Sequence, residues 1–405
     1  MTADIRVLRE DSDLVAAVNV FRAAMVGFAP LAGLESGRVG KLVEPGRTLG
    51  AFVDGELVAT ADSAASTLSV PGGGSVPHAA VTHVGVLPSH TRRGIASQLM
   101  VHQLRDLHRR GEVVASLRAS EATIYERFGY AVASTSQTVE VQTSRAALRS
   151  GVSAGGSVRL VDPAEAWDAL PRIYDRTRSR RPGAIDRPAV WWENQRLRAE
   201  GDHGARYVAL HGDSRSETGF VRYHPVGTDG WFTSAERTVV VDDLHAPTVE
   251  AYVGLLRFLL DLDLVDRLVF TSLPLDDPLP WLLADRRAAR VTGTRDETWL
   301  RVIDAAAALD ARRFVGDGSV VVSVEDAILQ HNSAIFEIST DGVRRTEGTA
   351  DLTIGVAALG AVLLGGVTWH ALALAGLVDV HDGAALSVAD AIFGSWPAPH
   401  AGMYF

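Results

Sequence analysis

The chain has 405 residues, of which 47% are hydrophobic and 22% charged. This excludes a disordered chain and provides enough apolar material for roughly two to four domains. The net charge of −10 argues against bulk nucleic-acid binding and favours a cationic small substrate. Cysteine is absent, which excludes disulfide frameworks, thiolate zinc sites and a catalytic thiol.

The first 150 residues show short strand and helix patterns in quick alternation. Apolar residues at steps of three or four predict a helix over 14–26, and Asp54-Gly55 between two apolar runs predicts a hairpin over 50–61. The other predicted elements are strands over 5–8, 79–86 and 113–119, a helix over 94–109 and a short helix around 124–125.

A second α/β pattern runs from about residue 157 to 290. It predicts helices over 164–174, around Trp191-Trp192 and over 246–260, and strands over 207–210, 218–223, 238–241 and 267–273. The basic run at 176–181 is interpreted as part of a solvated loop. Beyond residue 298 we expect strands over 319–324, 333–339 and 351–354, followed by helices rich in small residues.

The apolar stretch 352–380 is long enough to span a bilayer. Four glycines interrupt it, at 355, 360, 365 and 366, and its beginning has the pattern of a strand. We therefore interpret it as a buried strand followed by two packed helices rather than as a transmembrane segment.

Chemistry is concentrated in Val81–Met100, an apolar strand followed by a loop and an amphipathic helix. Free N–H groups at a helix N-terminus bind phosphate, and Arg92 and Arg93 can add bidentate contacts. Gly94 allows close approach of the backbone, while the strand offers N–H and C=O groups to an extended, amide-bearing ligand. This combination suits coenzyme A. His83 is interpreted as a strand residue, and the scattered histidines predict no metal site.

The run from Val84 to Ala96 resembles the acetyl-CoA motif of the GNAT acetyltransferases, [Q/R]-x-x-G-x-[G/A]. Gly94 and Ala96 match this motif, whereas Thr91 replaces its first residue. The segment Ser120–Tyr130 (SEATIYERFGY) resembles the Eis (enhanced intracellular survival) family of GNAT enzymes. Three further features extend this resemblance over the whole chain: SRRPGAIDRP with Trp191-Trp192, the segment Thr298–Phe314 and the C-terminal Phe405.

The resemblance implies an α/β (α+β) fold with two tandem GNAT-like mixed-sheet regions and a sterol-carrier-protein-like α+β region. The first, residues 1–150, would hold the acetyl-CoA site. The second, residues 151–292, would be GNAT-like without a cofactor site. The third, residues 293–405, would deliver the C-terminal carboxylate to the active site.

The resemblance also implies the roles of individual residues. Tyr125 is expected to act as general acid, and the terminal carboxylate of Phe405 as general base, while Tyr130 is expected to be structural. The residues expected to bind acetyl-CoA are Val84, Gly85, Val86, Arg92, Arg93, Gly94, Ile95, Ala96, Ser97, Ser120 and Glu121.

The activity implied is acetyl-CoA-dependent N-acetylation of a cationic small molecule such as an aminoglycoside, by direct attack of the amine. Protein lysines or other cellular polyamines are alternative acceptors. An alternative of another class is a non-catalytic protein that binds a lipid or another apolar ligand. The resemblance further implies a homohexamer without metal. Charges in MTADIRVLREDSD replace the apolar run of a signal peptide, so we expect a cytoplasmic protein, or one secreted without such a peptide, and no membrane partner.

Overall fold

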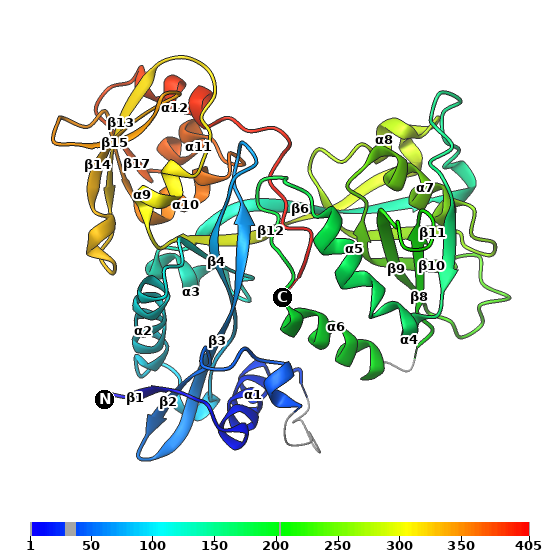
Figure 1. Ribbon diagram of the computed structural model, residues 1–405, viewed down its shortest axis with the longest axis horizontal. Helices are drawn as coiled ribbons and strands as arrows, with labels where there is room; N and C mark the ends of the chain where they lie inside the picture. The colour runs from blue at the N-terminus through cyan, green and yellow to red at the C-terminus, as the bar shows by residue number, and fades with distance from the viewer. Residues whose placement is uncertain (1, 29–37, 202–203, 405) are drawn as a thin grey trace.

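The computed structural model describes residues 2–28, 38–201 and 204–404. Figure 1 shows three lobes, with the end of the chain lying between them. The first lobe contains β1 (Asp4–Val7), α1 (Asp11–Met25), β2 (Leu49–Val53), β3 (Glu56–Ser69), β4 (Ser75–Val86), α2 (Ile95–Arg109), β5 (Val114–Leu117), α3 (Ala122–Tyr125) and β6 (Ala131–Gln142).

The second lobe follows directly along the chain. It contains β7 (Val158–Val161), α4 (Pro163–Ala166), α5 (Ala169–Thr177), α6 (Ala189–Gly201), β8 (Tyr207–His211), β9 (Gly219–Val226), β10 (Thr238–His245), α7 (Val249–Leu260), β11 (Arg267–Pro274), α8 (Leu279–Leu282) and β12 (Ala289–Val302). The helix expected over 164–174 is therefore two helices. Asp162 caps the first by accepting a hydrogen bond from the Ala164 N–H at 2.8 Å.

One twelve-stranded sheet runs through the first two lobes, in the order β1-β2-β3-β4-β5-β12-β6-β11-β10-β9-β8-β7. The late strand β12 lies between β5 and β6 of the first lobe, with Trp299 opposite Leu117 and also opposite Val132. The expected division at residues 292/293 falls inside this strand. The two lobes therefore share hydrogen-bonded backbone across their junction.

Local sequence explains the first lobe well. Asp54 and Gly55 both have positive φ, 53° and 85°, as the predicted tight hairpin turn requires. Helices α1 and α2 pack on opposite faces of the sheet: α1 on the side of Phe52, and α2 on the side of Leu49 and Ala51. Figure 1 shows the long β3–β4 hairpin between these two helices.

Two pairs of adjacent strands in this sheet are parallel, and in both pairs the two strands separate at one end. β4 pairs with β5 from His78 to Ala80, and β10 pairs with β11 from Thr238 to Val241. Beyond Ala80 and Val241 no pairing continues, so each pair of strands parts into a V-shaped opening. The other described neighbours in the sheet are antiparallel.

The third lobe has its own five-stranded sheet, in the order β15-β14-β13-β16-β17. Its elements are α9 (Ala305–Asp310), β13 (Ser319–Glu325), β14 (Ala334–Ser339), β15 (Gly342–Thr346), β16 (Leu352–Gly355), α10 (Val356–Leu363), α11 (Trp369–Leu374), β17 (Val378–Val380) and α12 (Ala385–Phe393). A Cβ at Gly360 would lie 2.7 Å from the Leu300 carbonyl oxygen, so α10 rests directly on β12.

The apolar stretch 352–380 folds as a strand and two helices, as its glycines predict, and ends in β17. Trp369 is fully buried and packs against Phe393, with ring centroids 5.0 Å apart. No helix in the described part of the chain has the length and apolar character needed to cross a membrane.

Candidate active site

The loop between β4 and α2 has the backbone shape expected of an anion cradle. Arg92 and Gly94 have positive φ, 61° and 79°, and Gly94 immediately precedes α2. The first N–H groups of a helix, here those of Ile95, Ala96 and Ser97, lack partners inside the helix, and glycine provides no capping side chain for them. They therefore remain available to a ligand.

The side chains of this loop complete the cradle. Arg92 and Arg93 are exposed, and neither forms an ion pair with a carboxylate among the described residues. The Thr91 hydroxyl donates to the Pro88 carbonyl oxygen at 3.2 Å. Thr91, which departs from the family motif, thus ties the loop to itself.

Val84, Gly85 and Val86 lie at the end of β4, beyond the residues that pair with β5, where β4 pairs only with β3. A Cβ at Gly85 would lie 2.9 Å from Ala24 Cβ, so glycine is needed here for the approach of α1. Ser120 and Glu121 follow the end of β5. The topology thus brings the expected cofactor residues to the two sides of one opening.

Tyr125 ends α3 beside this opening and is 6% exposed. Burial raises the pKa of its phenol, a hydrogen bond from the Ser120 side chain opposes this, and the Glu121 charge raises it further. The phenol therefore stays protonated at neutral pH. Tyr130, whose ring is 6.1 Å away, is fully buried, and its hydroxyl has no hydrogen-bond partner within the described residues.

A small cavity of about 50 Å³ lies beside β4 on the side facing α6. Asp62, on β3, is 3% exposed and accepts hydrogen bonds from the Thr48 hydroxyl at 3.1 Å and the Ser63 N–H at 2.8 Å. His83 also lines this cavity, with Nδ1 3.4 Å from an Asp62 carboxylate oxygen. Sequence reasoning missed Asp62, because a lone acidic residue in a strand carries no motif.

The 396–404 segment crosses from the third lobe into the space between the other two (Figure 1). The Ala398 N–H donates to Asp276 at 2.9 Å, and the Arg181 guanidinium donates to the Ala398 carbonyl at 2.6 Å. The Ala401 N–H donates to Glu297 at 3.0 Å. The expectation that the 176–181 run is solvated is therefore wrong for Arg181, which binds this segment.

The last described residues are held by three side chains from the other lobes. Arg187 donates to the Gly402 carbonyl at 2.6 Å, Arg118 to the Met403 carbonyl, and the Trp191 indole N–H to the Tyr404 carbonyl at 2.7 Å. Phe405 itself, the expected general base, lies outside the described residues.

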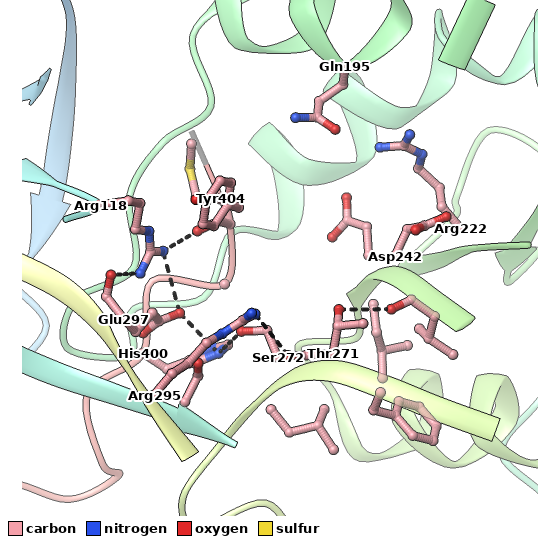
Figure 2. Close-up of a pocket in the computed structure, with 18 of the residues that line it drawn as sticks. Arg118, Gln195, Arg222, Asp242, Thr271, Ser272, Arg295, Glu297, His400 and Tyr404 are labelled. Carbon is pink, nitrogen blue, oxygen red and sulfur yellow. Dashed lines mark hydrogen bonds and ion pairs between the residues drawn. The ribbon is translucent and has the colours of Figure 1, made fainter. Parts of the chain in front are cut away.

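Glu297 anchors this arrangement from β12. Burial alone would raise the pKa of its carboxyl, but His400, Arg118 and the hydrogen bonds from Ala401 and Ser134 hold it below the usual range. Burial lowers the pKa of the His400 imidazole. Figure 2 shows Arg118, Glu297, His400 and Tyr404 together on one wall of a larger cavity. In the described part of the chain, no three His, Asp or Glu side chains are grouped as metal ligands.

Profile comparisons match this chain in three blocks. Acetyltransferase (GNAT) domain families match residues 4–133 and 183–302, and a sterol carrier protein domain family matches residues 305–402. The expected order of two GNAT domains and one sterol-carrier-like domain is confirmed.

Similar proteins match over nearly the whole chain. An uncharacterized N-acetyltransferase of Streptomyces avermitilis is 35% identical, covering 98% of both chains. N-acetyltransferase Eis of Mycobacterium tuberculosis is 33% identical over 93% of this chain and 94% of its own. The crystal structure of Eis1 from Mycobacterium abscessus is 48% identical, with a TM-score of 0.92 and coverage of 99% of this chain and 100% of that one. The chain therefore belongs to the Eis family of GNAT N-acetyltransferases.

Proposed function

We propose that this enzyme transfers the acetyl group of acetyl-CoA to an amine of a cationic small molecule, with aminoglycosides as the leading acceptor class. The observation that carries the proposal is the loop before α2, where Arg92, Arg93 and the N-terminus of the helix face no carboxylate of the described chain. Such a loop suits the pyrophosphate of coenzyme A.

We assign the cofactor to the first lobe alone, keeping residues 1–150, 151–292 and 293–405 as functional divisions. The corresponding loop of the second lobe, between β10 and α7, contains Ala246, Pro247 and Thr248. The Thr248 hydroxyl accepts a hydrogen bond from the Ala251 N–H at 3.2 Å. The chain itself thus caps this helix, and the loop carries no arginine for a pyrophosphate.

Acetyl-CoA supplies an activated thioester, and residues of this chain would handle the protons. Tyr125 is our candidate general acid, which protonates the departing sulfur. Its buried position, with Ser120 as partner, supports a phenol that keeps its proton until it is needed. The strand arm Val84–Val86 would orient the extended pantetheine.

The carboxylate of Phe405 is our candidate general base, as the family resemblance implies. The support from the described residues is indirect: three side chains of the first two lobes hold the carbonyls of residues 402–404. Such anchoring suits a segment that must present its end at a fixed position.

The small cavity beside β4 is our candidate site for the amine group of the acceptor. Asp62 is a buried carboxylate that pairs with no arginine or lysine of the described chain, and its neighbours are the Thr48 hydroxyl, the Ser63 N–H and the His83 ring, so it suits an incoming ammonium group. The net charge of −10 favours cationic acceptors over anionic ones.

Family resemblance also supports a homohexamer.

A thiol-release assay with acetyl-CoA tests this function directly. An aminoglycoside, spermidine and a lysine-containing peptide would be compared as acceptors, with a neutral polyol as control. We expect release with cationic amines and a raised KM in Asp62→Asn, while the Kd for acetyl-CoA stays unchanged. Release with none of the amines would contradict the function, and an unchanged KM in Asp62→Asn would remove Asp62 from the acceptor site.

A further inference from the structure

A second, larger cavity of about 490 Å³ lies at the opening between β10 and β11 (Figure 2). Its floor spans strands β12, β6, β11, β10 and β9, which are neighbours in the sheet. Helix α6 and residues 400–404 enclose it. The cavity thus occupies, in the second lobe, the position that the cofactor opening occupies in the first.

Three arginines line this cavity without a carboxylate partner in the described structure: Arg198, Arg222 and Arg295. Arg222 is 7% exposed, and its guanidinium stacks 4.6 Å from the Trp167 ring. Arg295 is exposed and donates to the Thr271 carbonyl oxygen at 2.9 Å. Arg198 is exposed on α6.

The acidic residues near Arg222 are already engaged by other cations. Arg187 binds Asp243 through two hydrogen bonds of 2.7 and 2.9 Å. Asp242 lies 3.3 Å from Arg206 and 2.9 Å from His224. Burial lowers the pKa of Arg222, and the neighbouring carboxylates only partly offset the cost of burying its charge.

Neutral donors converge on the same space. The Ser136 hydroxyl, on β6, is fully buried, lines the cavity and has no hydrogen-bond partner in the described structure. Buried polar groups are normally paired, so an unpaired hydroxyl at a cavity wall points to a polar ligand. Figure 2 shows the Gln195 amide on the same side as Arg222 and Asp242.

We propose that this cavity binds a small molecule with an oxyanion group, a carboxylate or a phosphate, held by Arg222 with Arg198 and Arg295 nearby. Guanidinium groups are the usual partners of such anions, and the volume suits a ligand the size of a sugar phosphate. This site is distinct from the coenzyme loop and borders the small acceptor cavity, with which it shares Trp191, Gln195, Arg198 and Met403.

Isothermal titration calorimetry on the full-length protein tests this site. The probes are glucose 6-phosphate and citrate, with glucose as the neutral control. All titrations use the Arg92→Ala/Arg93→Ala background, so that anion binding at the coenzyme loop does not contribute. We expect saturable binding of at least one anionic probe and none of glucose. A preference for glucose 6-phosphate would indicate a phosphate ligand, and a preference for citrate would indicate a carboxylate ligand.

Arginine variants localise the binding. Arg222→Gln, and separately Arg198→Gln/Arg295→Gln, should each weaken it by about ten- to hundredfold, as expected for lost charged hydrogen bonds. The double variant changes only exposed side chains, so it remains informative if Arg222→Gln folds poorly. Arg290→Gln is the matched control, because Arg290 lies on the same strand as Arg295, outside the cavity, and pairs with Glu140 at 3.5 Å. Absence of anion binding, or anion binding that survives both cavity variants, would overturn the proposal.

Discussion

Removing the Tyr125 hydroxyl tests whether this residue is catalytic or only packs in the core. In Tyr125→Phe the ring and its packing remain, and only the transferable proton is lost. We predict a fall in kcat of roughly 10²–10⁴-fold, with little change in the Kd for acetyl-CoA, measured by thiol release and calorimetry.

The matched control for this change is Tyr130→Phe. The Tyr130 hydroxyl is buried without a described partner, so its removal breaks no hydrogen bond. Its kcat should stay close to that of the wild type. Equal turnover in Tyr125→Phe and wild type would show that Tyr125 serves packing alone.

Two buried histidines couple stability to pH. Burial, together with Arg47 for His78 and Arg187 for His245, lowers the pKa of each imidazole to about 3. In the unfolded chain each imidazole binds a proton below pH about 6.5. The unfolded state therefore takes up more protons between these values, and stability is fully present above pH 6.5 and declines as the pH falls.

The expected slope is about 1.4 kcal/mol of unfolding free energy per pH unit for each histidine. Urea unfolding measured from pH 7.5 to 5.0 checks this, and His245→Gln should show a shallower slope than the wild type. A stability that stays flat between pH 6.5 and 5.0 would contradict the neutral, buried state of both side chains.

At the scale of elements, the loop between β4 and α2 works as a unit. We predict that Arg92→Ala/Arg93→Ala weakens acetyl-CoA binding by about 1.5–3 kcal/mol for each charged hydrogen bond lost. Because both side chains are exposed, the melting temperature should not change. Calorimetry that gives the wild-type affinity for this variant would remove the pyrophosphate from the loop.

Elements with strong local signals were predictable from the sequence. The Asp54-Gly55 turn and the buried face of α2, with Met100, Leu104 and Leu107, follow from conformational preference and periodicity. The place of β12 in the sheet could not be predicted in this way, because a strand's position in a sheet depends on partners far along the chain. The sequence likewise cannot show that Arg181 holds Ala398, a contact across 217 positions.

The candidate site, like the fold, was predictable where the sequence signal is local and not where it depends on distant contacts. Residues 84–97 and 120–125 form recognisable runs, and the topology brings both runs to one opening. Asp62 and Arg222 carry no motif, since their roles arise only where separate elements enclose a cavity.

At the scale of the whole molecule, the 396–404 segment links all three lobes, and this makes the protein sensitive to changes at its end. One Gly added after Phe405 would move the terminal charge by about 3.5 Å and replace the proposed base with an amide. We predict a loss of about 10²-fold in kcat/KM. The melting temperature should fall only modestly, because the segment's contacts up to Tyr404 remain.

Comparison of a protein with an N-terminal tag and one extended at the C-terminus checks this prediction. A third protein that ends at Tyr404 should be equally impaired, because its carboxylate falls one residue short. Equal kcat/KM in all three would exclude the terminal carboxylate as base and direct attention to side chains such as Asp62.

The position of β12 has a consequence for how the protein is made. Its partners β5 and β6 end at Leu117 and Gln142, whereas β12 begins at Ala289. A ribosome needs on the order of ten seconds to add the intervening residues. During that time the first lobe exposes two unpaired strand edges, which are templates for intermolecular pairing. We therefore expect a fragment that stops before residue 289 to aggregate, because both of these edges stay unpaired in it.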